Sequence, residues 1–121
     1  MKDERDYRDY LNDILRYAEM GERITIDIDF ETFCSNDEKT LAAIQILEVI
    51  GEASKKLPKS LKNRYPEVPW SEMAATRDKL IHAYHLIEFE IVWRTLTEDI
   101  PLLKRSMRKI LDDIEQESPK P

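Results

Sequence analysis

An arginine, a histidine and a tyrosine lie close together in segment 77–84, which is predicted to be helical. Arg77 shares a helix face with Leu80 and Tyr84, so its guanidinium lies on an otherwise apolar stripe, where an unpaired charge is costly. His82 follows five residues later, about 140° around the helix and about 7.5 Å along its axis. The length of the arginine side chain still allows both groups to reach one phosphate.

This pair suits the cleavage of RNA by its own 2′-hydroxyl group. A histidine, with an ordinary pKa of about 6.5, can accept the hydroxyl proton or protonate the leaving oxygen, and an arginine can neutralise charge on the transition-state phosphate. One histidine is short of an acid–base pair, and a symmetric dimer would supply a second His82 and a second Arg77. From the spacing alone, a partly buried Arg–His–Tyr network that only joins helices is the more common arrangement.

A run of five bases without an intervening acid stands out in an acidic chain. The chain has 25 acids, 19 bases and a net charge of −6, which argues against a large duplex-binding surface. The bases are candidates for RNA backbone contacts: Lys55, Lys56, Lys59, Lys62 and Arg64. A solvated helix end is the alternative, because cations suit the C-terminal dipole of the preceding helix. Tyr65, next to this run, is a candidate for stacking on a base.

Other patterns predict structure rather than chemistry. His82, His85 and Glu88 have a possible metal-ligand spacing, but no cysteine or second cluster accompanies them, so no metal site is expected. The chain has no glycine-rich phosphate loop, and no cofactor is expected. Trp70 and Trp93 are predicted to be core or helix-contact aromatics.

Apolar spacing predicts the helices that carry these residues. The first helix runs over about 3–20 and ends near Gly21, a residue typical of helix C-termini. Segment 24–33 alternates like a strand but has no partner strand, so an extended connector is predicted. A capping box at Ser35 begins the second helix, which runs to about Leu57.

Prolines divide the second half of the chain. They leave room for only a short helix around 60–64: Pro58, Pro66 and Pro69. Ser71 is predicted to cap the third long helix. The last helix carries a heptad seam: Phe89, Trp93, Leu96, Ile100, Leu103, Met107, Ile110 and Ile114. Pro101 interrupts this seam, which predicts a kink or break at 98–101 with Pro101 in the first turn of a new segment.

These elements predict an all-α fold, an antiparallel bundle of four long helices with a short extra helix. A chain of 121 residues with 41% hydrophobic residues and two glycines fits one domain over 1–117, followed by a flexible tail over 118–121. The lone Cys34 and the charged first residues predict a cytoplasmic protein. No apolar run reaches the ~20 residues of a membrane span, so no membrane role is expected.

The run Arg77-x4-His82-x-Tyr84 resembles the signature of the HepT toxins, which are part of the HEPN superfamily of small all-helical proteins. Similar blocks span nearly the whole chain. They include Arg5-Asp6-Tyr7, Asp37-Glu38-Lys39-Thr40, the segments 47–53 and 65–70, and Phe89-Glu90-Ile91-Val92-Trp93.

The resemblance implies an HEPN-like bundle that dimerises with its two motifs facing each other. It also implies a metal-independent endoribonuclease that is the toxin of a type VII-like toxin–antitoxin pair, with Arg77 and His82 as catalytic residues. Family antitoxins of the MNT type are minimal nucleotidyltransferases that transfer AMP onto the motif tyrosine, here Tyr84, and the added charge would repel RNA phosphate. Asp78 stands where asparagine is more usual, and it could pair with Arg77, orient His82 or weaken RNA binding.

Two other functions are compatible with the same residues. A non-catalytic partner could dock against a nucleotidyltransferase and help to present its substrate, a role that the family resemblance also allows. A purely structural helical scaffold would leave Arg77 and His82 dispensable.

Overall fold

The computed structural model describes residues 6–82 and 88–117, with the backbone alone for residues 81 and 82. Within these ranges the chain is helical and has no strand. The elements are α1 (Tyr7–Thr25), α2 (Phe30–Ser35), α3 (Asp37–Lys55), α4 (Lys59–Arg64), α5 (Trp70–His82), α6 (Phe89–Arg94), the π-helical stretch η2 (Thr95–Asp99) and α7 (Ile100–Glu117).

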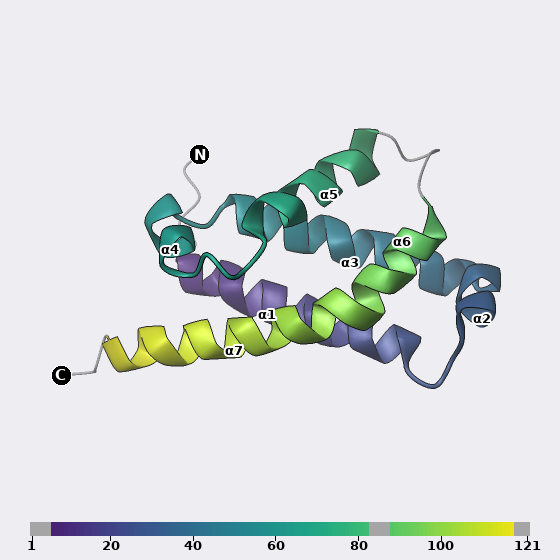
Figure 1. Ribbon diagram of the computed structural model, residues 1–121, viewed down its shortest axis with the longest axis horizontal. Coiled ribbons are helices and arrows are strands. Elements are labelled where there is room, and N and C mark those ends of the chain that lie inside the picture. The colour runs from purple at the N-terminus through teal and green to yellow at the C-terminus, as the bar shows by residue number, and fades with distance from the viewer. Residues whose placement is uncertain (1–5, 83–87, 118–121) are drawn as a thin grey trace.

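The long helices run back and forth along the molecule (Figure 1). α1 packs between α3 and α7, and α5 packs on the other side of α3. α6, η2 and α7 form one continuous rod, and the end of α5 stands away from that rod (Figure 1). The predicted all-α antiparallel bundle of four long helices is therefore confirmed.

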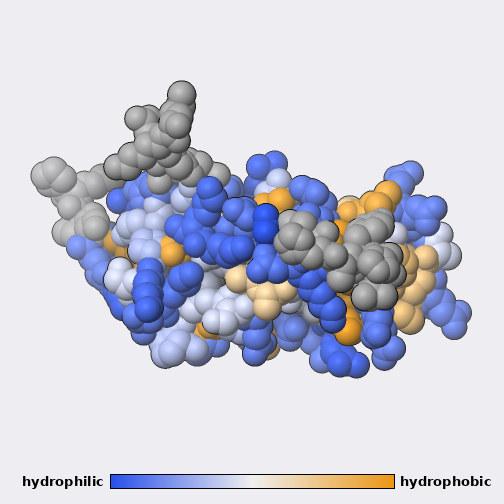
Figure 2. Space-filling model, turned by 90° about the horizontal axis from the view of Figure 1, so that it is seen from above, coloured by the Kyte–Doolittle hydropathy of each residue, from blue (hydrophilic) through white to orange (hydrophobic). Residues whose placement is uncertain are grey.

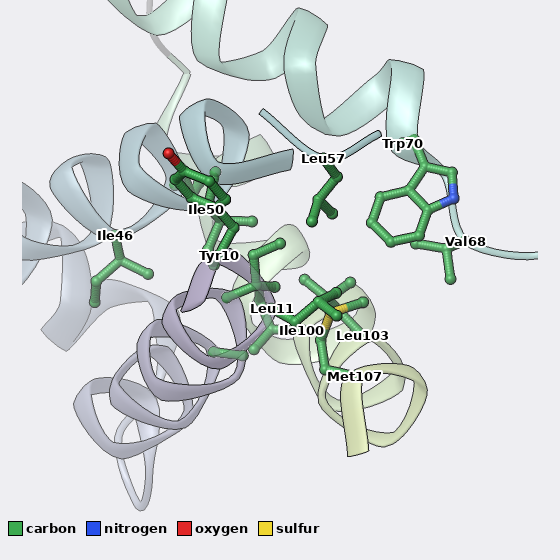
Figure 3. Packing of buried hydrophobic residues seen from close by; sticks show 14 of the residues in the cluster. Tyr10, Leu11, Ile46, Ile50, Leu57, Val68, Trp70, Ile100, Leu103 and Met107 are labelled. Carbon is green, nitrogen blue, oxygen red and sulfur yellow. The ribbon is translucent and has the colours of Figure 1, made fainter. Parts of the chain in front are cut away.

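The core lies where α1, α3 and α7 meet the segment around α4. Figure 3 shows side chains from these elements gathered around Leu11, Leu103 and Met107. Most of the predicted heptad seam is buried, from Leu96 to Ile114, because its apolar positions face α1. Among residues 6–82 and 88–117, each helix is too short or too polar to span a bilayer.

The first helix begins and ends later than the predicted range of about 3–20. α1 begins after Asp6, whose side chain accepts a hydrogen bond from the amide of Arg8, and it continues to Thr25. Gly21 is not a C-cap: it lies inside the helix and is buried. A Cβ built on Gly21 would lie 3.1 Å from Leu96 Cδ2, so the small residue allows the η2 segment to pack closely on α1.

The predicted extended connector over 24–33 is wrong. Thr25 still belongs to α1, and Asp29 caps the short helix α2 by accepting a hydrogen bond from the amide of Thr32 at 2.8 Å. Phe33 of α2 is fully buried against Trp93, with ring centroids 5.3 Å apart. Tertiary packing of these rings overrides the local alternation that suggested a strand.

Two predicted helix caps are displaced. Ser35 is the last residue of α2, and the side chain of Asn36 caps α3 by accepting a hydrogen bond from the amide of Lys39. α5 begins at Trp70, one residue before the predicted cap Ser71. The short helix around 60–64 is confirmed as α4.

The expected irregularity at Pro101 takes the form of a π-helical turn. The amide of Ile100 bonds to the carbonyl of Thr95, five residues earlier, and Pro101 lies in the first turn of α7. Proline has no N–H to continue an α-helical ladder and its ring crowds the carbonyl one turn back, so a wider turn at this point accommodates it.

Candidate active site

Helices α3 and α5 approach each other closely at Gly51. A Cβ on Gly51 would lie 2.2 Å from Arg77 Cβ and 2.8 Å from the carbonyl oxygen of Met73. Both distances are far below van der Waals contact, and one of them is to backbone, which cannot move without moving α5. Glycine at this position therefore allows the Cβ of Arg77 to pack directly against the backbone of α3.

The guanidinium of Arg77 belongs to a group of four charged side chains, here named the Arg77 cluster: Glu52 and Lys55 of α3 with Arg77 and Asp78 of α5. Arg77 Nη2 lies 3.0 Å from Glu52 Oε2, and Nη1 donates a hydrogen bond to Asp78 Oδ1 at 3.1 Å. Lys55 Nζ donates to the same Asp78 oxygen at 3.1 Å. Charges of opposite sign thus alternate across the two helices.

The Arg77 cluster is only partly covered. The Arg77 side chain is 25% exposed, and those of its three partners are 40–47% exposed. The hydrogen bond from Lys55, followed by the one from Arg77, holds the pKa of Asp78 below its ordinary value. Pairing with Arg77, one of the roles open to Asp78 from sequence, is present among the described side chains.

The other two motif residues are placed less fully. His82 is the last residue of α5, on the same helix as Arg77, and only its backbone is described. Tyr84 and His85 lie outside the described residues, so the tyrosine assignment and the expectation that the two histidines hold no metal stay predictions. Within the described ranges, no group of three or more metal-ligating side chains occurs.

The structure divides the basic run among different environments. Lys55 pairs with Asp78 of the Arg77 cluster. Lys62 Nζ donates to the carbonyl of Ser54 at 3.2 Å, and Arg64 pairs with Glu117. Lys56 and Lys59 are exposed around the turn that joins α3 and α4. Lys55 is thereby joined to the motif arginine through Asp78.

Comparison with known proteins identifies the family. A family model described as Ribonuclease HepT-like matches residues 14–110. The chain belongs to the HepT-like ribonuclease family. A Thermococcus cleftensis protein named "Probable ribonuclease HepT" is 46% identical over 106 residues, which cover 88% of this chain and 96% of the relative.

Further relatives come from other organisms. A protein of Methanocaldococcus jannaschii is 43% identical, covering 93% of this chain and 97% of its own, and one of Caldanaerobacter subterraneus is 40% identical, covering 86% and 93%. Each is named a "Putative RNase". No solved structure matches this chain.

A groove of about 340 Å³ opens between α5 and the η2–α7 rod of this HepT-like domain. Its apolar lining includes Leu47, Ile50, Met73, Ile100 and Leu103. Three acids line it without any base: Glu67, Glu72 and Asp99. Leu102 at its edge is 57% exposed. By contrast, the face that carries α5 is mostly hydrophilic, with hydrophobic patches mainly toward the end with α2 and α6 (Figure 2).

Tyr65 belongs to a second charged group, here named the Tyr65 cluster: Arg64, Tyr65, Lys109, Asp113 and Glu117. The Tyr65 hydroxyl donates to Asp113 Oδ2 at 2.8 Å, and the residue is 5% exposed. The prediction that Tyr65 stacks on a base is therefore wrong. Trp70 and Trp93 pack in or against the core, as predicted; the Trp70 indole donates to the carbonyl of Tyr65 at 3.0 Å.

Sequence reasoning missed Gly51 and Glu52. A glycine inside a helix with a broad apolar face costs about 1 kcal/mol relative to alanine, so its presence is a sign of close helix packing. That sign pointed to α3 but gave no indication of its partner. Glu52 follows Gly51 and is placed beside Arg77 only by the crossing of the two helices.

Proposed function

We propose that this protein is the toxin of a type VII-like HepT/MNT toxin–antitoxin pair, acting in the cytoplasm as an endoribonuclease that needs no metal ion. Membership of the HepT-like ribonuclease family supports RNA as the substrate. The observation that carries the proposal is the setting of the Arg77 guanidinium. Carboxylates from two helices contact it, and the side chain is still 25% exposed. Arg77 also precedes His82 by five residues on the same helix.

In the proposed reaction, Arg77 and His82 are the catalytic residues. The 2′-oxygen of a ribose attacks the adjacent phosphorus as histidine accepts the hydroxyl proton. The bond to the 5′-oxygen breaks, and that oxygen is protonated as it leaves. The products are a 2′,3′-cyclic phosphate and a 5′-hydroxyl end, and Arg77 neutralises the charge that develops on the phosphate oxygens.

A homodimer would bring two such motifs together and would supply an acid and a base. The apolar groove between α5 and the η2–α7 rod, with exposed Leu102 at its edge, supports a second copy docking against these elements. The exposed bases Lys79 and Arg105 of the same helices are candidates to meet the acids of the groove. Sedimentation over a wide concentration range tests this assembly, and a strict monomer that cuts RNA would contradict it.

The basic run is proposed to contact the RNA backbone. The pairing of Lys55 with Asp78 supports Lys55 as a phosphate contact next to Arg77. Lys56 and Lys59 are exposed nearby and would extend the path. Lys62 donates to a backbone carbonyl and Arg64 pairs with Glu117, so RNA would have to compete with these contacts. Replacing Lys56 and Lys59 by alanine should weaken RNA binding and reduce its salt dependence.

Cleavage of RNA by the purified chain is the direct test. We expect cutting of a labelled RNA in the presence of a chelator, with 2′,3′-cyclic phosphate ends, and loss of cutting by about 10²–10⁴-fold in His82→Ala. His82→Ala should retain the helical content and hydrodynamic radius of the wild type. Full cleavage by a folded His82→Ala variant would contradict the assignment.

The proposed antitoxin is an MNT-type nucleotidyltransferase that adds AMP to Tyr84. Support for this step is the resemblance of the motif alone. With the cognate enzyme, ATP and magnesium, intact-mass spectrometry should detect AMP that maps to Tyr84, and the modified protein should lose cleavage. Tyr84→Phe should remain an active nuclease that the enzyme no longer silences. AMP on another residue would contradict the assignment of Tyr84.

The alternative, a non-catalytic partner that presents substrate to a nucleotidyltransferase, is compatible with the same contacts. The two carboxylates on Arg77 are what a purely structural ion-pair network would also contain. This alternative predicts that purified protein leaves RNA intact with and without metal ions. It also predicts that the nucleotidyltransferase modifies its substrate faster when this chain is present.

A further inference from the structure

The guanidinium of Arg77 has two carboxylate neighbours, and one of them belongs to a different helix. Asp78, on α5, accepts a hydrogen bond from Nη1 through an oxygen that also accepts from Lys55. Glu52, on α3, lies 3.0 Å from Nη2. The two contacts involve different nitrogens, so together they restrict the direction of the guanidinium more than either would alone.

The helix crossing explains why the second contact comes from α3. Arg77 Cγ lies 3.0 Å from the place of a Cβ on Gly51, so the side chain leaves α5 across the backbone of α3. Glu52 is the next residue along α3. An arginine side chain is long and flexible, and it keeps one direction only where such a partner is fixed beside it.

We propose that Glu52 is a positioning residue for Arg77, fixing the guanidinium in the direction in which it meets an RNA phosphate. This inference rests on the proposed function, because it concerns the arginine assigned to phosphate. A guanidinium has five N–H donors. The contacts with Glu52 and Asp78 involve Nη2 and Nη1, and neither involves the Nε–H group. Donors therefore remain for a phosphate while the carboxylates are in place.

A carboxylate in this position has two opposing effects on the reaction. It orients Arg77, which favours the transition state, and it repels the phosphate of bound RNA. Removal of its charge should therefore lower kcat without raising KM. A residue that only supported the fold would instead change the amount of active protein and its stability.

Glu52→Gln removes the charge with little change in shape. We expect kcat to fall by about 10–10²-fold, the loss typical of a misplaced reacting group, with KM unchanged or lower. Glu48→Gln is the matched control, one turn earlier on α3 and also partly buried, and it should behave as the wild type. Arg77→Ala and the double variant Arg77→Ala/Glu52→Gln should have the same residual activity, because Glu52 acts through Arg77.

A second measurement does not depend on cleavage. Nitrogen-edited NMR of the arginine side chains should give separate Nη signals for Arg77 in the wild type, assigned by their absence from Arg77→Ala. These signals should average in Glu52→Gln and stay separate in Glu48→Gln. Wild-type kcat together with separate signals in Glu52→Gln would overturn the inference and leave the proposed function intact. Full cleavage by Arg77→Ala would overturn both.

Discussion

The Arg77 cluster and the Tyr65 cluster have nearly the same charged composition and different surroundings. Each contains two bases and two acids drawn from two parts of the chain. In the Tyr65 cluster a buried ring lies among the charges, with Arg64 Cζ 5.6 Å and Lys109 Nζ 5.3 Å from its centroid. In the Arg77 cluster the central group is a guanidinium that is 25% exposed.

The kinds of charged residue present therefore do not identify a site. In the Tyr65 cluster the charged groups contact the Tyr65 ring and its hydroxyl. These contacts join the segment after α4 to α7. The Arg77 cluster fixes one cation at a helix crossing and leaves N–H donors for a ligand. The two clusters differ in their central group: a buried phenol in one, and in the other a partly exposed guanidinium that two carboxylates contact.

Removal of one base from each cluster should give the largest contrast. Arg77→Ala should lower RNA cleavage by about 10²–10³-fold, the usual loss when one stabilising group at a developing oxyanion is removed. Lys109→Ala should cut RNA at the wild-type rate. Single-turnover cleavage assays with circular dichroism as a folding control measure both effects. Equal losses in the two variants would mean that the distinction between the clusters is wrong.

The helix crossing beneath the Arg77 cluster can be tested with two glycines. Gly51→Ala should destabilise the fold by about 1–3 kcal/mol, because its Cβ would collide with the α5 backbone. Gly21→Ala should change stability by less than about 1 kcal/mol. Its Cβ would lie 3.1 Å from the end of the Leu96 side chain and at ordinary contact distance from Ile46 and Ile100, and alanine favours the helix. Urea unfolding measures both, and equal effects would contradict the packing argument.

The sequence was informative about elements whose partners lie on regular faces. The seam from Leu96 to Ile114 predicts the buried face of α7 because its spacing repeats. The sequence could not predict the partners of the basic run, because they are distant along the chain. Asp78 lies 23 residues from Lys55, and Glu117 lies 53 residues from Arg64. The motif arginine was found from its spacing, but its neighbour Glu52 required the helix crossing.

The predicted connector over 24–33 failed for a related reason. Alternating residues suggested extended backbone, but Asp29 caps α2 and Phe33 packs on an aromatic ring 60 residues later. Local patterns describe what a segment prefers alone. The distant ring that decides its conformation is not part of that pattern.

A smaller effect is expected from the buried hydroxyl of the Tyr65 cluster. Tyr65→Phe should cost about 1 kcal/mol of stability, because it removes the hydrogen bond to Asp113, which can regain water in part. RNA cleavage should not change. Tyr7→Phe, at a partly buried tyrosine of α1, is the control and should change stability by less. A loss of cleavage in Tyr65→Phe would bring the Tyr65 cluster into the site.

The smallest effects should appear in the pH dependence of stability. Hydrogen bonds from Lys55 and then Arg77 lower the pKa of Asp78, and hydrogen bonds from Tyr65 and then Lys109 lower that of Asp113. Because the pKa is lower in the folded state, the contribution of each carboxylate to stability is fully present above the unfolded-state pKa of about 3.9. This contribution is lost as pH falls through the folded-state pKa. Asp78→Asn and Asp113→Asn should therefore each lose stability less steeply than the wild type below about pH 4.

The pH dependence of stability in alkaline solution should distinguish the two clusters. Burial, and then the hydrogen bond to Asp113, raise the pKa of Tyr65, so its contribution is present below about pH 10 and is lost as pH rises through the folded value. Tyr65→Phe should flatten this loss, whereas Asp78→Asn should leave it unchanged. Urea midpoints measured from pH 3 to 11 test both limbs. If Asp78→Asn and Asp113→Asn kept the wild-type acid slope, the two carboxylates would not be stabilised by their hydrogen bonds in the folded state.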